Sequence, residues 1–108
     1  MRILLDECVP KPLKREFIDF NLKTVQEMGW SGTKNGALLN LMSQAEFTVL
    51  LTSDQNIKYE QNLKKAGVSV IAMVARTNRL TDLVRLKPKI INALFVIKPG
   101  ELIEVSSD

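Results

Sequence analysis

The sequence contains no histidine and a single cysteine, Cys8, among its 108 residues. A chain without histidine cannot carry a Ser-His-Asp triad, a Cys-His pair or imidazole acid–base catalysis. One cysteine without histidine also excludes a tetrahedral Cys/His zinc site and an intrachain disulfide. Oxygen ligands remain. Because carboxylates bind Mg²⁺, Mn²⁺ or Ca²⁺, an enzyme built on this chain would use a hard-metal site made of Asp and Glu.

Long apolar runs are also missing. No segment approaches the roughly 20 apolar residues of a membrane span, and the run at residues 3–5 is too short for the core of a signal peptide. We therefore expect a cytoplasmic protein that does not enter a membrane. A hydrophobic fraction of 45% and a charged fraction of 25% predict one globular domain over residues 1–108. The net charge of +3 is compatible with a phosphate-bearing partner but does not identify one.

Short apolar strands alternate with helical segments along the chain. Runs rich in apolar and β-branched residues predict strands at 3–5, 22–28, 48–52, 68–74 and 102–105. Apolar residues at helical spacing predict helices at 10–20, 35–46, 55–65 and 81–97, the last divided near Pro88. This order predicts an α/β fold with a mostly parallel central sheet flanked by helices in three layers.

Acidic residues follow two of the expected strands. Asp6 and Glu7 come directly after the first strand, and Asp54 follows the strand at 48–52. In open parallel sheets, ligands bind outside the carboxyl ends of the strands at a topological switch point. If these two strands are neighbours, Asp6 and Asp54 converge, and a cation between them would relieve their repulsion. The alternative is that Asp54 only caps the next helix and that Asp6 and Glu7 are solvated turn residues.

Three segments resemble a family of small bacterial PIN-like domain proteins. They are residues 3–10 (ILLDECVP), residues 25–36 (VQEMGWSG followed by KNG) and residues 49–56 (VLLTSDQN). The similarity extends to at least Asn78-Arg79-Leu80. The resemblance implies a PIN-like fold and a minimal relative of the PIN ribonucleases, which include VapC-type toxins. Those enzymes cleave RNA with Mg²⁺ or Mn²⁺ held by a cluster of acidic residues.

The resemblance also implies the site residues. Asp6 and Asp54 match the catalytic acids, and both join Glu7 and Asn56 in the implied metal-binding set. Many relatives carry an acid where this chain has Asn56, and Ala37 leaves the start of the second helix without one. Each missing carboxylate removes charge that holds a divalent ion. Two functions therefore stay open: a metal-dependent ribonuclease, and an RNA-binding or protein-binding module without turnover.

Basic residues complement the expected site. Residues 76–89 contain five basic residues against one acid, Asp82, a balance suited to a phosphate backbone or to a solvated helix face. The residues expected to bind substrate are Lys11, Lys34, Asn35, Arg76 and Arg79. RNA is the expected partner. A cognate antitoxin is expected if the chain is the toxin of a toxin–antitoxin pair, and apolar helices near the chain ends are compatible with a homodimer.

Three other features have competing interpretations. Trp30 is expected to cover the core rather than to stack on bases. Cys8 is expected to be at least partly buried, because no histidine is present to activate its thiol. Lys98-Pro99 is similar to the Lys-Pro turn of phosphoreceiver domains, which carry a phosphoacceptor acid where this chain has Asp54. A phosphoreceiver-like signalling domain is therefore the third functional interpretation.

Overall fold

The computed structural model describes residues 1–55 and 60–107. In this part of the chain five strands form one sheet in the order β2-β1-β3-β4-β5. They are β1 (Arg2–Leu5), β2 (Asn21–Thr24), β3 (Val49–Thr52), β4 (Ser69–Val74) and β5 (Leu102–Ser106). Every neighbouring pair is parallel, which confirms the expected α/β class. The strand order reverses between β1 and β3, so the switch point of the sheet lies between these two strands.

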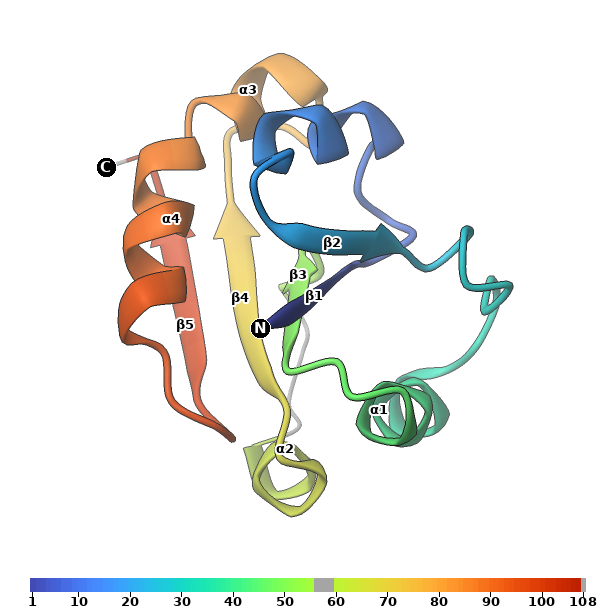
Figure 1. The fold of residues 1–108 in the computed structure, drawn as a ribbon. Helices are drawn as coiled ribbons and strands as arrows, with labels where there is room; N and C mark the ends of the chain where they lie inside the picture. The colour runs from blue at the N-terminus through green and yellow to red at the C-terminus, as the bar shows by residue number, and fades with distance from the viewer. Residues whose placement is uncertain (56–59, 108) are drawn as a thin grey trace.

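Helices cover both faces of the sheet (Figure 1). The 3₁₀ helix η1 (Lys11–Phe17), α3 (Leu80–Val84) and α4 (Lys87–Val96) pack on one face. The opposite face is covered by α1 (Asn35–Gln44) and α2 (Glu60–Ala66). This is the three-layer arrangement that the alternation of strands and helices predicts.

Successive residues of the inner strands point into two separate hydrophobic cores. On β1, Ile3 and Leu5 belong to the core beneath η1, α3 and α4, whereas Leu4 belongs to the core beneath α1 and α2. On β3, Leu51 and Leu50 divide in the same way. Because side chains alternate between the two faces of a sheet, a strand covered on both sides must be apolar throughout. This explains why these strands lack polar alternation.

Two of the expected elements are shorter or tighter than the sequence predicts. The helix expected at 10–20 is a 3₁₀ helix, whose amides bond three residues back, as from Leu13 N to Pro10 O at 3.0 Å. The strand expected to reach residue 28 ends at Thr24. There Thr24 Oγ1 accepts from Glu27 N at 3.0 Å and Glu27 Oε1 accepts from Thr24 N at 2.9 Å. These reciprocal bonds close a turn directly after Thr24, which still pairs with Leu5 of β1, so the strand does not continue to residue 28.

The expected C-terminal helical region is two helices, as the position of Pro88 predicts. The first, α3, ends at Val84, and α4 begins at Lys87 with Pro88 in its first turn. A proline in a first turn costs no helical hydrogen bond, because amides at that position have no partner within the helix. The longest described helices, α1 and α4, have ten residues each. None of the described helices has the length and apolar character needed to cross a membrane.

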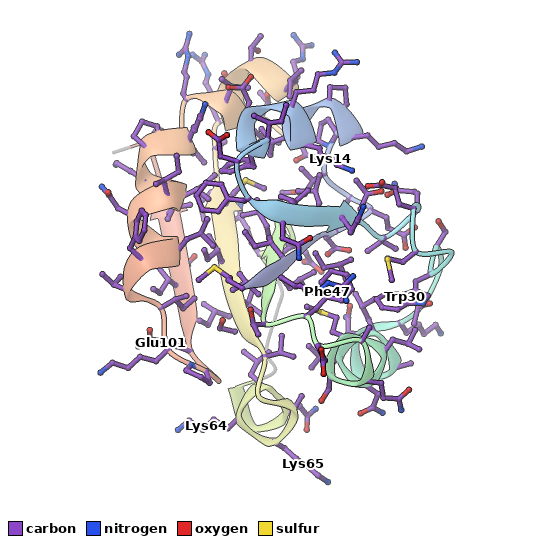
Figure 2. The ribbon with its side chains drawn as sticks, viewed as in Figure 1. Lys14, Trp30, Phe47, Lys64, Lys65 and Glu101 are labelled. Atoms are coloured by element: carbon purple, nitrogen blue, oxygen red, sulfur yellow. The ribbon has the colours of Figure 1, made fainter. Side chains whose placement is uncertain are left out.

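Gly100 turns the chain into β5 against the backbone of α2. Its φ is 81°, and a Cβ at this position would lie 2.9 Å from Lys64 Cα. Figure 2 shows Lys64 of α2 and Glu101, the neighbour of Gly100, at the same end of the molecule. We expect Gly100→Ala to lower the free energy of unfolding by about 2 kcal/mol, because backbone strain and a backbone clash add. Urea unfolding measures this loss.

Gly67→Ala is the matched control for this prediction. Gly67 also has a positive φ, 69°, but a Cβ there would meet nothing within 4 Å. Strain alone should cost about 1 kcal/mol. Equal losses in the two variants would contradict the contact between Gly100 and α2.

Candidate functional site

The two acids expected to converge follow adjacent strands at the switch point. Asp6 comes directly after β1 and Asp54 two residues after Thr52, the last residue of β3. β1 and β3 are parallel neighbours, and Asp6 N continues their ladder by donating to Leu51 O at 3.0 Å. Both acids are half-buried. The sheet therefore brings their loops to one edge, where ligands bind in open parallel sheets.

The buried hydroxyl of Thr52 joins the two loops. Thr52 is fully buried, and its Oγ1 donates to Asp6 Oδ2 at 2.8 Å while accepting from Asp54 N at 3.0 Å. The other carboxylate oxygen of Asp6, Oδ1, accepts from Glu7 N at 2.8 Å. Two donors thus fix the orientation of the Asp6 carboxylate, and one of them also fixes the backbone of Asp54. Each carboxylate oxygen has a second lone pair available for a ligand.

Glu7 has a different partner. Its two carboxylate oxygens accept from Gly32 N at 3.0 Å and 3.2 Å, so the side chain points to the loop between β2 and α1. The Glu7 carboxylate is therefore directed at this loop and not at Asp6 and Asp54. Glu7 instead closes a loop in which Gly32 has a φ of 78°. Because its carboxylate is directed at this loop, Glu7 contributes less to a cation site between the loops after β1 and β3.

The donors present suit a weakly held cation. Asn56, the fourth expected metal ligand, lies outside the described residues. Among the residues that are described, no group of three or more His, Cys, Asp or Glu side chains is arranged to hold a metal ion. Mg²⁺ commonly keeps several waters and binds through one or two carboxylates together with substrate phosphates. Asp6 and Asp54 fit that mode, whereas a complete cage of protein ligands would need more donors.

Cys8 lies exposed at the rim of this site, so the expectation that it is at least partly buried was wrong. Its Sγ is 3.5 Å from Thr52 Oγ1 and 3.4 Å from Ser53 Oγ. The reason is the turn after β1, in which Val9 N donates to Asp6 O at 3.1 Å. That turn buries Val9 and leaves Cys8 at the surface.

A cavity of about 220 Å³ opens beside the loop that carries Asp54. Its lining includes the chain neighbours of Asp54 and the loop after β4, namely Ser53, Gln55, Arg76, Thr77 and Asn78. The Asn78 side chain crosses to the loop after β1, where its Nδ2 donates to Cys8 O at 2.6 Å. The loops after β1, β3 and β4 therefore form one continuous rim.

The expected substrate-binding residues do not all lie at this rim. Arg76 lines the cavity beside Asp54, and Arg79 is exposed on the same loop. Lys11 lines a separate cavity of about 370 Å³ formed by η1 and β2. Lys34 and Asn35 are exposed at the start of α1, in the other helical layer. Arg76 and Arg79 are thus the expected basic residues that the structure places on the loop bordering the acidic site.

Trp30 covers the core, as expected. Its ring meets the ring of Phe47 edge to face at a centroid distance of 5.7 Å, and Figure 2 shows the two side chains close to α1. The Arg2 guanidinium lies 4.1 Å from the centroid of the same Phe47 ring. The indole therefore contributes to packing rather than forming a free platform for a base.

Lys98 lies at the opposite end of the sheet from Asp6 and Asp54. Lys98 and Pro99 lie between α4 and β5, at the amino end of β5, whereas Asp54 follows the carboxyl end of β3. Since all five strands are parallel, these are opposite edges of the sheet. The sheet order matches that of phosphoreceiver domains. However, the lysine that suggested this interpretation is absent from the edge where the phosphoacceptor would lie.

An ion pair braces the loop after β2. Lys14 Nζ of η1 lies 2.7 Å from Glu27 Oε1, and the two side chains are 38% and 40% exposed. The hydrogen bond from Lys14, followed by the one from the Thr24 amide, lowers the pKa of Glu27 from 4.5 to about 2. A carboxyl group with a depressed folded-state pKa stabilises the fold above its unfolded pKa. That stabilisation is lost as the pH falls through the folded value.

We therefore expect Glu27→Gln to cost more stability at pH 7 than at pH 2. The difference should develop between about pH 4.5 and about pH 2. Because both side chains are partly exposed, it should stay below about 1 kcal/mol and shrink in high salt. Urea unfolding of both proteins across this pH range measures it. A cost that does not change with pH would show that the Glu27 carboxylate is not paired in solution.

No family model matches the chain, and neither a curated protein nor a solved structure matches it.

Proposed function

We propose that this chain is a PIN-like ribonuclease dependent on Mg²⁺ or Mn²⁺, with its site at Asp6 and Asp54. The observation that carries the proposal is the Thr52 hydroxyl, which holds the Asp6 carboxylate at 2.8 Å and the Asp54 amide at 3.0 Å. A buried hydroxyl shared in this way fixes two acidic loops at the switch point of the sheet. Positioning of this kind is what a ligand-binding carboxylate requires.

The chemistry available at this edge is hydrolysis of a phosphodiester. A water oxygen bonds to phosphorus, the bond from phosphorus to the leaving oxygen breaks, and the leaving oxygen takes up a proton. When bound, a divalent cation neutralises charge on the phosphate and makes a water molecule more acidic. None of these steps needs histidine, in agreement with the composition.

The side chains of the site divide this work. Asp6 and Asp54 bind the cation through their carboxylates, while Thr52 orients Asp6. Arg76 lines the neighbouring cavity, and under this proposal its guanidinium contacts a substrate phosphate. Under this proposal RNA is the substrate, and a cognate antitoxin protein is the partner that the resemblance to toxins implies.

A second candidate is RNA binding without turnover. Ala37 is exposed in the first turn of α1, where the resemblance leads us to expect an acid, and Glu7 is engaged by Gly32. Both observations reduce the negative charge available for a cation. The basic residues of the β4–α3 loop would still bind phosphates under this alternative.

The test combines cleavage and binding of a single-stranded RNA by the purified chain. The ribonuclease proposal expects cleavage with Mg²⁺ or Mn²⁺ and none with EDTA. Binding that persists in EDTA, together with no cleavage in either metal, would replace the proposal by the second candidate. Cleavage that is equally fast with EDTA would contradict the metal dependence.

A further inference from the structure

A second and larger cavity, of about 500 Å³, lies beyond the rim of the acidic site. The loop after β4, the short helix α3 and the end of β5 form its walls. The residues that matter for its chemistry are Arg76, Thr77, Arg79, Asp82, Arg85 and Ser107. Its volume falls within the range of roughly 300 to 1,000 Å³ that is typical of small-ligand sites, which is room for one nucleotide unit.

Among the described residues, the lining of this cavity carries more positive than negative charge. Three guanidinium groups line it against one carboxylate, that of Asp82, which accepts a hydrogen bond from Thr77 Oγ1. Within the described residues, none of the three arginines takes part in a salt bridge. Guanidinium groups bind phosphate through paired N–H donors. The cavity therefore suits a phosphate better than an apolar ligand.

The two cavities share a wall. Arg76 and Thr77 line both the larger cavity and the smaller one beside Asp54. Ser53 and Gln55 line only the smaller cavity, and Arg85 and Ser107 line only the larger one. An RNA strand that runs from Asp54 past Arg76 would therefore enter the larger cavity next.

We infer that the larger cavity binds a backbone phosphate of the same RNA strand, next to the phosphate held at Asp6 and Asp54. This inference rests on the proposed function. A duplex presents its phosphates on the outside of a wide cylinder, whereas a single strand can place phosphate and sugar in a hollow of this size. Arg79 and Arg85 bind the phosphate, and Arg76 lies between the two positions.

The test is the salt dependence of RNA binding, measured by fluorescence anisotropy with a short labelled oligouridylate in EDTA. Each single-strand phosphate contact contributes about 0.7 to the slope of log K against log salt concentration. We expect Arg79→Gln and Arg85→Gln each to reduce the slope by about 0.7 and to weaken binding by about fivefold. Oligoadenylate should give the same losses, because phosphate contacts carry no base information.

Lys98→Gln is the control, since it removes the same charge from an exposed residue between α4 and β5, at the opposite edge of the sheet. It should bind like wild type, and all three variants should unfold thermally like wild type. Wild-type binding by both arginine variants, or an equal loss in Lys98→Gln, overturns the inference even if the wild type cleaves RNA. Arginine-dependent binding without metal-dependent cleavage supports the cavity and overturns the proposed ribonuclease.

Discussion

Asp6→Asn is expected to lower the rate of metal-dependent RNA cleavage by more than about 100-fold while the protein stays folded. Replacing groups that only orient a metal ligand typically costs roughly 10- to 100-fold, and the loss of the ligand's own charge should cost more. The asparagine keeps one of the two acceptor oxygens, which is enough for Glu7 N, so the turn after β1 should persist. Initial cleavage rates at several Mn²⁺ concentrations, with urea unfolding beside them, measure both effects.

Glu7→Gln tests whether the effect is specific to Asp6 or extends to the acid next to it in the sequence. Glu7 neighbours Asp6 in sequence, but its carboxylate accepts from Gly32 N. The glutamine retains one acceptor oxygen for that amide, so the cleavage rate should change by no more than about twofold. A loss as large as that of Asp6→Asn would show that Glu7 serves the site rather than the loop.

Thr52→Val is expected to reduce cleavage by about 10- to 100-fold and to raise the Mg²⁺ concentration needed for half-maximal rate. Valine has nearly the shape of threonine, so the packing at this fully buried position is retained. The substitution removes the donor to Asp6 and the acceptor for the Asp54 amide. Leaving these polar groups without that partner should also cost about 1 to 3 kcal/mol of stability.

Thr52→Ser is the matched variant, because it keeps the hydroxyl and removes only a methyl group. It should recover most of the cleavage rate and the wild-type requirement for Mg²⁺. If Thr52→Ser were as impaired as Thr52→Val, packing rather than the shared hydroxyl would explain the loss.

Much of the fold could be predicted because it depends on local patterns of apolar residues in the sequence. Continuous apolar runs such as residues 49–51 identify strands buried on both faces, and their alternation with helices implies a parallel sheet. What could not be predicted depends on specific contacts. The end of β2 is decided by the reciprocal bonds of Thr24 and Glu27. The exposure of Cys8 is decided by the turn at Asp6 to Val9.

The adjacency of the Asp6 and Asp54 loops could be predicted from the sequence, but the groups that hold these loops could not. Acids after two strands pointed to Asp6 and Asp54, and the adjacency of β1 and β3 agrees with that expectation. Thr52 ends its strand as a β-branched residue and gave no signal of its hydroxyl's role. A glutamate beside Asp6 could equally face the other acid or the backbone. Arg85 lines the larger cavity together with Ser107, and the sequence pattern does not predict that these two residues lie close together.

The most direct test of the account compares wild type, Asp6→Asn, Asp54→Asn and Asp19→Asn in one assay of single-stranded RNA cleavage with Mn²⁺. Asp19 is an exposed acid just beyond η1 and away from the sheet edge, so its variant controls for the change of charge. We expect cleavage by wild type and by Asp19→Asn, and loss of cleavage in the other two variants. Equal cleavage by all four proteins would contradict a site at Asp6 and Asp54.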